Sequence, residues 1–386
     1  MKNQIVNATI VLRDKVLDGG VIRFDDGIIS YIGKVADDSY ATIDADGGYV
    51  VPGFIDIHCH GGGGFDFMDA SASEMLEISR FHLSHGTTTM VATTMTDTWD
   101  AICASLDRFS AIPTEERLTL HGVHLEGPWL NPLQCGAQSV DKMDRPSAMR
   151  LSEILSRYPF VERVSVAPEL DEGHEVGKYA RARGIVASVA HSDADFDETI
   201  SAADNGYSLM THLYSGMKGV WRKNAYRTAG AVEAALYDDR IFVEIIADGK
   251  HLPEGLLKLI YKCKGAERIA LVTDAMRGAG MPDGSETVLG RMEDGVLAII
   301  EDGVAKLPDR QSFAGSVATA DRLFCVMIGA GIGLAEVSKM LSETPAKIMG
   351  YTDRGSLEIG KLADALVLDK NYNIKKIFLK GAEYVS

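Results

Sequence analysis

The sequence predicts an α/β fold: a (β/α)8 TIM-like barrel with a small β-sandwich domain formed from both chain termini. Eight short apolar runs in the middle of the chain each end in a polar residue, and stretches long enough for a crossover helix separate them. Polar strand ends suit this fold, because the active site of such a barrel lies at the carboxyl ends of its strands. A doubly wound open sheet is the alternative, but it would gather its polar ends at one switch point.

The eight apolar runs are the expected barrel strands. In chain order they are Phe54–His60, Thr87–Met95, Leu120–Glu126, Val164–Glu169, Ile185–His191, Leu209–Tyr214, Phe242–Asp248 and Ile269–Asp274. Apolar spacing predicts helices in several intervening segments, among them Ser71–Ser84, Ser147–Arg157, His174–Arg183 and Ala194–Asn205. Because strands and helices alternate, we expect parallel strands joined by right-handed crossovers.

Both ends of the chain read as short strands and turns rather than as further strand and helix units. The chain has 386 residues, whereas a barrel of this kind typically needs roughly 250. The strand-like runs are Ile5–Arg13, Gly20–Phe24, Ile28–Ile32 and Ala41–Asp44 near the start, and Ala363–Asp369 and Lys375–Leu379 near the end. We therefore expect residues 1–52 and 355–386 to form the sandwich domain and residues 53–354 to form the barrel domain, with Pro52-Gly53 at the boundary.

Composition argues against several classes of partner. The formal net charge is −16 and no basic cluster is longer than Trp221-Arg222-Lys223, whereas a nucleic-acid-binding protein needs a positive surface. No run of about 18 apolar residues and no secretory signal order is present, so we expect no membrane association and a cytoplasmic protein. The five cysteines are scattered, which fits reduced thiols rather than a disulfide framework.

His58 and His60 are the first candidate metal ligands. Residues two apart in an extended strand point to the same face, so both imidazoles can reach one ion. Cys59 between them should point away and pack as a small apolar side chain. A His-x-His pair also arises by chance or in a protein core, so it does not identify a metal site on its own.

Three later strands also end in a residue of a type that binds metal ions. Glu126 ends the third, and His191 and His212 close the fifth and the sixth. Each alone has a simpler interpretation, as a surface glutamate or a buried histidine. Together they supply three nitrogen and oxygen ligands for zinc or iron and leave a position open for water. His124, two residues before Glu126 on the same face, is expected to support the ligands rather than to bind the ion.

Asp274 closes the eighth strand and is the expected catalytic residue. It could take a proton from a metal-activated water and pass it to a leaving group, although an aspartate there could also cap a helix. Asp248 ends the seventh strand and is a candidate substrate contact, and His251 three residues later either contacts a substrate or only packs. The whole pattern predicts a metal-dependent hydrolase.

The order of these motifs resembles the amidohydrolase superfamily and, within it, the N-acetylglucosamine-6-phosphate deacetylases. The motifs that carry the resemblance are Pro52-Gly53-Phe54-Ile55-Asp56-x-His58-x-His60, His124-Leu125-Glu126-Gly127-Pro128-Trp129, Ala167-Pro168-Glu169, Ala190-His191-Ser192, Thr211-His212-Leu213-Tyr214, Ile246-Ala247-Asp248-Gly249-x-His251, Val272-Thr273-Asp274-Ala275 and Ala314-Gly315-Ser316. They span nearly the whole chain, and the pairing of His-Leu-Glu-Gly-Pro with Ile-Ala-Asp-Gly is far more specific than His-x-His alone.

The resemblance implies a hydrolase that removes the acetyl group from a phosphorylated N-acetyl amino sugar and releases acetate. It makes Glu126, His191 and His212 the principal ligands of a divalent metal ion. Zinc is the favoured metal, with iron, manganese, cobalt and nickel as alternatives.

The resemblance also implies a second divalent ion, held by His58, His60 and Asp274 with Glu126 as a bridge. Asp274 would be the acid and base of the reaction and would protonate the departing sugar nitrogen. The family likeness further implies a homodimer, in which a loop of the partner would complete the phosphate site.

Departures from the family pattern fall on substrate contacts and none falls on a metal ligand. Gly136-Ala137-Gln138 replaces Gly-x-His, Ser215-Gly216 replaces Asn-Ala, and Phe313-Ala314-Gly315 replaces Leu-Ser-Gly. The Arg-x-Pro-Gly motif with its phosphate-binding arginine is missing in that form. The candidate replacements are Arg222, Lys223 and Arg227, with His251.

The sequence therefore does not decide which substrate the protein uses. N-acetylgalactosamine 6-phosphate, another N-acyl sugar or an N-acyl amino acid are the alternatives on the same scaffold. A non-catalytic binding protein is a third hypothesis, which the retention of every candidate ligand and of Asp274 disfavours.

Overall fold

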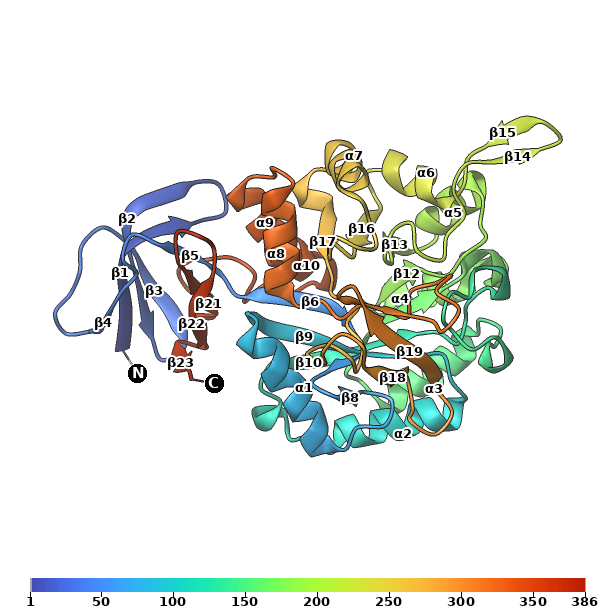
Figure 1. Cartoon of the computed structure of the whole chain (residues 1–386), viewed down its shortest axis with the longest axis horizontal. Coiled ribbons are helices and arrows are strands. Elements are labelled where there is room, and N and C mark those ends of the chain that lie inside the picture. The colour runs from blue at the N-terminus through green and yellow to red at the C-terminus, as the bar shows by residue number, and fades with distance from the viewer. Residues whose placement is uncertain (1, 386) are drawn as a thin grey trace.

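The computed structural model describes residues 2–385, and Figure 1 shows a larger body of strands and helices with a smaller all-β unit beside it. Both chain ends lie in the smaller unit. The largest hydrophobic cluster fills the larger body, whereas a separate cluster around Ile5, Phe24 and Phe378 fills the smaller one.

Eight parallel strands make the central sheet of the larger body. They are β6 (Phe54–Cys59), β9 (Thr87–Thr94), β10 (Leu120–Glu126), β11 (Val161–Val166), β12 (Val186–Val189), β13 (Tyr207–Met210), β16 (Phe242–Ile245) and β17 (Ile269–Leu271). They pair in the order β17-β16-β13-β12-β11-β10-β9-β6. Beyond β17 the chain meets β6, where the Asp274 amide donates to the His58 carbonyl at 2.9 Å and Cys59 pairs with Ala275. The sheet thus curls on itself, in agreement with the predicted TIM-like barrel.

Ten α-helices lie among residues 2–385, and most of them connect successive barrel strands (Figure 1). They are α1 (Ala72–Ser84), α2 (Trp99–Ser110), α3 (Ala148–Arg157), α4 (Glu175–Ala182), α5 (Phe196–Asp204), α6 (Ala231–Tyr237), α7 (Glu254–Lys264), α8 (Ala320–Gly329), α9 (Leu334–Leu341) and α10 (Glu343–Met349). The four helices predicted from apolar spacing are all present. Three of them, α1, α3 and α5, begin after a side-chain cap, as where Ser71 accepts a hydrogen bond from the Glu74 amide and Asp195 from the Glu198 amide.

Several barrel strands end earlier than the sequence predicts, among them β16, which stops three residues before Asp248. β12, β13 and β17 stop two or three residues before His191, His212 and Asp274. These three residues have φ angles of 42°, 27° and 48°, whereas an extended strand needs negative φ. β11 is also displaced toward the N-terminus, because Pro168 already begins a 3₁₀ turn. The prediction placed the right polar residues at the barrel mouth, but they turn out of their strands.

The two ends of the chain form one mixed sheet. Its strands are β1 (Lys2–Val11), β2 (Val16–Asp25), β3 (Ile28–Gly33), β4 (Ala41–Asp44), β5 (Tyr49–Pro52), β21 (Ala365–Leu368), β22 (Ile374–Leu379) and β23 (Ala382–Tyr384). β21 pairs antiparallel with β5, so the first and last segments of the chain are hydrogen-bonded together. A turn at Asp25-Asp26-Gly27 joins β2 to β3.

Short strands outside the two main sheets decorate the barrel. They are β7 (Gly61–Gly62) with β8 (Phe65–Asp66), β14 (Trp221–Lys223) with β15 (Tyr226–Thr228), and β18 (Glu286–Leu289), β19 (Val296–Glu301) and β20 (Val304–Lys306). The β14–β15 hairpin projects away from the barrel (Figure 1). Among residues 2–385 there is no helix with the length and apolar content to cross a membrane.

Candidate metal centre and active-site cavity

Glu126 at the end of β10 is the centre of a cluster of six buried polar side chains. Its carboxylate oxygen Oε1 lies 2.9 Å from His212 Nε2 and 3.5 Å from His191 Nε2. These three residues arrive from different strands, because β10, β12 and β13 all point their carboxyl ends at the same barrel mouth. They form the first of two groups that could hold a metal ion.

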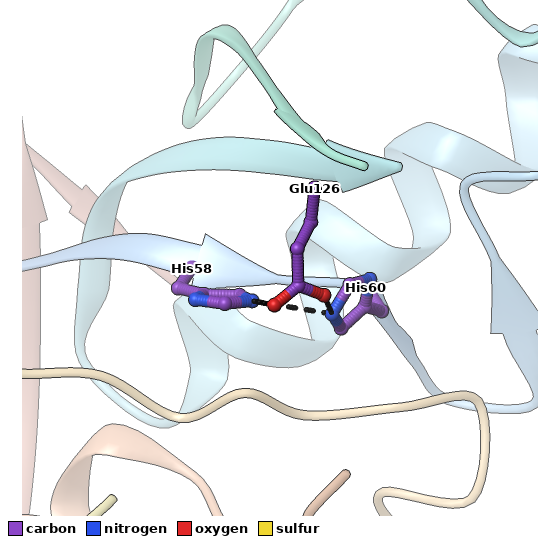
Figure 2. Close-up of side chains that lie close together, drawn as sticks. All are labelled: His58, His60 and Glu126. Atoms are coloured by element: carbon purple, nitrogen blue, oxygen red, sulfur yellow. Dashed lines mark hydrogen bonds and ion pairs between the residues drawn. The ribbon is translucent and has the colours of Figure 1, made fainter. Parts of the chain in front are cut away.

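The second group shares Glu126 with His58 of β6 and with His60, which directly follows that strand. Figure 2 shows the Glu126 carboxylate lying between the His58 and His60 rings, at 3.6 Å from His58 Nε2 and 3.2 Å from His60 Nε2. Asp274 Oδ1 approaches the same two nitrogens at 3.5 and 3.2 Å. All five predicted ligands and the predicted catalytic aspartate are thus brought together.

The chemistry of these donors fits a divalent cation. Ligand atoms held about 2.0–2.2 Å from a tetrahedral ion stand roughly 3.3–3.6 Å from one another. The two ring nitrogens His58 Nε2 and His60 Nε2 face each other at 3.2 Å, and the atoms of each group lie within 4.8 Å of one another. Nitrogen and carboxylate oxygen together suit zinc and iron(II) better than calcium or magnesium.

Electrostatics in the cluster also favour a cation. Burial raises the pKa of the Glu126 carboxyl, but the surrounding histidines, His58 foremost, outweigh that and hold the pKa well below its ordinary value. Burial lowers the pKa of His58 and of His60, yet the carboxylates of Glu126 and Asp274 raise these values to about 9 and about 10. Because the carboxylates stabilise positive charge so strongly, a metal ion can take the place of these protons.

Cys59 and His124 lie where the sequence places them. Cys59 is fully buried and its Sγ faces His82 Nε2 at 3.3 Å, away from the ligand cluster. His124 bonds to Ser165 Oγ at 2.7 Å, and its ring packs edge-on against His58 at 4.8 Å between centroids. His124 thus supports a ligand ring and is not a member of either candidate metal group.

Close backbone approaches hold His191 in position. Its Nδ1 lies 2.8 Å from the Gln134 carbonyl, which fixes the proton on Nδ1 and turns Nε2 toward Glu126. Gly216 has a φ of +58°, and a side chain there would bring its Cβ within 2.6 Å of His191 Nδ1. The non-glycine positive φ of His191 itself is an uncommon conformation that is often found at functional sites.

The cluster opens into a cavity of about 300 Å³, at the small end of the range for small-molecule sites. Its wall contains most of the predicted substrate contacts: Ala137, Gln138, Ser215, Gly216, His251, Phe313 and Gly315. It also contains residues that were not predicted to contact a substrate, namely Met95, Gly136, Leu289, Arg310, Gln311 and Ser312. Arg310 is the only arginine or lysine among the wall residues.

Gln138, which stands in place of the family's usual histidine, is tied to the metal centre. Its amide Nε2 donates to Glu126 Oε2 at 2.8 Å, and its Oε1 accepts from the Thr96 amide at 3.0 Å. The second N–H of the amide points toward Met95 Sδ at 3.9 Å, a weak partner. Gln138 therefore orients the Glu126 carboxylate and keeps one donor for a ligand.

Two of the predicted contacts lie behind the cavity wall. Asp248 accepts from His251 Nδ1 at 2.9 Å and from the backbone amides of Lys250 and His251 at 2.8 Å, so it holds His251 against the cavity rather than lining it. His251 also packs on Phe313, 4.6 Å between ring centroids. Ala314 is fully buried, and its amide is used in a hydrogen bond to the Ala305 carbonyl.

The predicted phosphate-binding cations do not reach the cavity of their own chain. Arg222 and Lys223 on β14 and Arg227 on β15 are exposed on the hairpin that projects from the barrel (Figure 1). The antiparallel pairing of Arg222 with Arg227 fixes both at the same level of this hairpin. None of the three is among the residues of the cavity wall.

A buried ion pair beneath the ligands is a further feature that was missed. Arg163 on β11 and Glu244 on β16 are both fully buried and contact each other. A signal was available for Glu244, which interrupts the otherwise apolar strand β16, but not for Arg163, because β11 also contains Glu162 and Ser165. Sequence alone could not show that the two side chains meet across the barrel.

Comparison with known proteins shows to which family the chain belongs. The amidohydrolase family model matches residues 49–383. The N-acetylglucosamine-6-phosphate deacetylase of Lysinibacillus sphaericus is 32% identical over 98% of this chain and 95% of that protein. The N-acetylgalactosamine-6-phosphate deacetylase of Escherichia coli O157:H7 is 30% identical over 95% of this chain and 94% of that protein.

Solved structures of similar proteins match this chain over its full length. The crystal structure of the Pasteurella multocida N-acetylglucosamine-6-phosphate deacetylase superposes with a TM-score of 0.92 at 26% identity and covers 100% of both chains. A mutant of the Mycobacterium smegmatis enzyme, in complex with N-acetyl-D-glucosamine-6-phosphate, gives 0.91 at 29% identity and the same coverage. The resemblance stated from the motifs is confirmed, and the chain belongs to the amidohydrolase family.

Proposed function

We propose that this protein hydrolyses the acetamide of N-acetylglucosamine 6-phosphate to give glucosamine 6-phosphate and acetate. The observation that carries the proposal is the cluster of Glu126, four histidines and Asp274 at the mouth of a cavity of about 300 Å³. Deacetylases of this sugar phosphate are similar to the chain over nearly its whole length, both in sequence and in structure.

The metal cofactor would be one or two divalent ions. Glu126, His191 and His212 would hold the first, and His58, His60 and Asp274 the second, with Glu126 shared. Zinc suits these ligands best, and iron, manganese, cobalt or nickel would also be accepted. A divalent ion held there would polarise the acetamide carbonyl and lower the pKa of a water molecule.

Asp274 would carry the proton. Burial raises the pKa of its carboxyl, but His58 and His60 outweigh that and lower the pKa below its ordinary value, so the group is ionised at neutral pH. The ionised carboxylate takes a proton from the attacking water. It then delivers that proton to the sugar nitrogen as the C–N bond breaks, which avoids expulsion of an amide anion.

Gln138 and His251, which both line the cavity, would orient the substrate. The free N–H of Gln138 can donate to the acetamide oxygen, which takes up negative charge as water attacks. His251 is held through Nδ1 by Asp248, which leaves its Nε2 for a hydroxyl or phosphate oxygen. Ser215 and the backbone of Ala137, Gly216 and Gly315 complete the polar wall.

The phosphate would bind at the rim of the cavity. Arg310 contributes a cation from the same chain, because its guanidinium bonds to Glu301 at 2.7 Å yet still borders the cavity. We propose a homodimer in which the partner adds Arg222 and Arg227 from its projecting hairpin. The strongly exposed Tyr226 at the hairpin tip supports a contact surface there.

Matched substrates test the proposal. Acetate release should be much faster from N-acetylglucosamine 6-phosphate than from N-acetylglucosamine, and Arg227→Ala should reduce that difference. Equal kcat/KM values for the two sugars would contradict the assignment of a phosphorylated substrate, but the assignment as a hydrolase would stand.

N-acetylgalactosamine 6-phosphate is the second candidate substrate, followed by other N-acyl sugars and N-acyl amino acids. The similarity to the Escherichia coli deacetylase of that epimer favours it. The replaced positions Gln138, Ser215 and Phe313 all border the cavity, where they would contact the sugar. A faster reaction with the galactose epimer than with the glucose epimer would decide for this candidate.

We also propose that residues 1–52 and 355–386 form a separate β-sandwich domain and residues 53–354 the hydrolase domain. The separate hydrophobic cluster of the terminal sheet supports this division. Five free cysteines and a net charge of −16 support a cytoplasmic enzyme without nucleic-acid or membrane partners. Limited proteolysis that cuts near residues 52 and 355 would agree with the division.

A further inference from the structure

An ion pair is buried in the barrel directly beneath the metal centre. Arg163 Nη2 donates to Glu244 Oε2 at 2.9 Å, and Arg163 Nη1 contacts Glu244 Oε1. The guanidinium also donates to the Thr211 hydroxyl at 2.9 Å, the Ile57 carbonyl at 3.1 Å and the Ser188 hydroxyl at 3.2 Å. Every Arg163 nitrogen therefore has a partner, and the geometry of the pair is fixed.

Stability does not explain why two charges are kept at this depth. Both side chains are fully buried, and removing two charges from water costs several kcal/mol per ion. Apolar side chains of similar volume at such positions are often as stabilising or more so. A function in the site above the pair is therefore the better explanation.

Glu244 faces the metal-site residue His58. Its Oε2 lies 3.3 Å from His58 Nδ1. An ionised carboxylate only accepts hydrogen bonds, so the proton of the neutral imidazole is placed on Nδ1. The lone pair of Nε2 is then turned toward Glu126 and Asp274, at 3.6 and 3.5 Å.

The other histidines of the cluster lack such a partner. His191 Nδ1 contacts a backbone carbonyl, and within residues 2–385 no hydrogen-bond partner is found for Nδ1 of His60 or His212. Glu244 also accepts from the His212 backbone amide at 3.4 Å. The carboxylate thus lies between the strands that carry His58 and His212, and among these four rings it contacts the His58 ring.

We propose that Glu244, itself held by Arg163, is a positioning residue that fixes the tautomer and orientation of His58 and thereby secures the second divalent ion. The inference rests on the proposed function, because it assumes that the cluster holds metal. Carboxylates behind a ligating histidine typically contribute about 10–100-fold in metal affinity. The first ion, on His191 and His212, does not use His58.

Two double variants separate positioning from packing. Arg163→Met with Glu244→Leu removes both charges and the acceptor for His58 Nδ1. Arg163→Met with Glu244→Gln also removes both charges but keeps an amide oxygen that can accept from Nδ1. Because neither variant leaves a lone buried charge, both should fold, whereas Glu244→Gln alone would strand Arg163.

The experiment is a zinc titration of metal-free full-length protein in competition with a chromophoric chelator, which gives one dissociation constant per ion. Metal content after gel filtration provides the number of ions per chain. Affinity for the first ion is an internal reference, because a general loss of structure would weaken both ions.

We expect the Leu double variant to bind the second ion about 10–100-fold more weakly than the parent, with the first ion within about threefold. The Gln double variant should bind both ions nearly as the parent does. The inference is overturned if the Leu variant keeps the second ion, or if both double variants lose it equally, which would indicate packing alone.

The parent protein distinguishes this inference from the proposed function. If it binds a single ion that His58→Asn does not affect, the positioning inference fails and a mononuclear hydrolase remains. If it binds no divalent ion at all, the proposed function fails together with the inference.

Discussion

At the scale of single residues, the site depends on where protons and charges are held. Asp274 Oδ1 lies 3.5 and 3.2 Å from the Nε2 atoms of His58 and His60, whereas the Glu244 carboxylate contacts His58 through Nδ1. Glu126 is held by histidines and by Gln138, so it is not free to move a proton. Asp274 is therefore the group to which we assign proton transfer.

Replacing Asp274 by asparagine should lower kcat by about 100- to 10,000-fold, the usual contribution of an acid–base residue. The first ion should stay bound, because Glu126, His191 and His212 are unchanged. Steady-state acetate release and metal analysis of the same sample provide the check. Turnover near that of the parent would remove Asp274 from proton transfer.

Arg310 should matter only for substrates that carry phosphate. Arg310→Ala is expected to raise KM for the phosphorylated sugar about tenfold, since hydrogen bonds to charged groups contribute about 1.5–3 kcal/mol and this side chain is partly exposed. The KM for the unphosphorylated sugar should not change. Arg150→Ala is the matched control, because both arginine side chains are 48% exposed and each bonds a glutamate. An equal effect on both sugars would assign Arg310 a structural role.

At the scale of elements, the strand ends and the loops after them build the site. Polar residues at the ends of apolar runs could be recognised from the sequence, which is why the five candidate metal ligands and Asp274, which the structure brings together, were singled out. The conformation of those ends could not be recognised, because a pattern of apolar residues does not indicate the positive φ of His191 and His212.

Other parts of the site could not be predicted from the sequence for similar reasons. Arg310 comes to the cavity on the loop after β20, and an isolated arginine in a loop carries no pattern. Asp248 and Ala314 were correctly placed near the site, but their burial behind His251 and Phe313 depends on packing across strands. From the sequence, the projecting hairpin around Arg227 could not be distinguished from a loop that folds back onto the barrel.

The loop at Gly216 should be sensitive to a single methyl group. Gly216→Ala brings a Cβ within 2.6 Å of His191 Nδ1, so the ring must move and the first ion should bind at least tenfold more weakly. Gly184→Ala is the control for backbone strain, because Gly184 has a φ of +71° and nothing within 4 Å of its Cβ position. Chelator competition on both variants measures the effect. Equal affinities in the two would show that the loop is free to adjust.

The β14–β15 hairpin should determine assembly. Replacing residues 221–228 by a short glycine linker should leave the barrel folded but convert the proposed dimer to a monomer, because the hairpin projects from the body and exposes Tyr226. Light scattering after gel filtration measures the mass. An unchanged oligomer would place the interface elsewhere.

At the scale of the whole molecule, the metal centre should link stability to pH. In the metal-free protein, burial lowers the pKa of His58 and His60, but the neighbouring carboxylates raise the pKa values to about 9 and about 10, above the ordinary value of about 6.5. The stability that these two protonated rings contribute is fully present below about pH 6.5 and is lost as pH rises through about 9 to 10.

We therefore expect the unfolding temperature of the metal-free protein to fall between pH 7 and pH 10. The zinc-loaded protein should show a smaller fall, because zinc takes the place of the protons. A His58→Asn and His60→Asn double variant, measured without metal, should lose this pH dependence. Identical profiles for the metal-free parent and that variant would show that the two histidines do not control stability.

The central claim is a metal-dependent deacetylase, and one measurement tests it most directly. Acetate release from N-acetylglucosamine 6-phosphate should be followed in metal-free protein while zinc is added back. The account predicts no activity without metal and full activity at one or two ions per chain. Activity that is unchanged by removal of metal, or no acetate from any N-acetyl sugar phosphate at full metal occupancy, would contradict it.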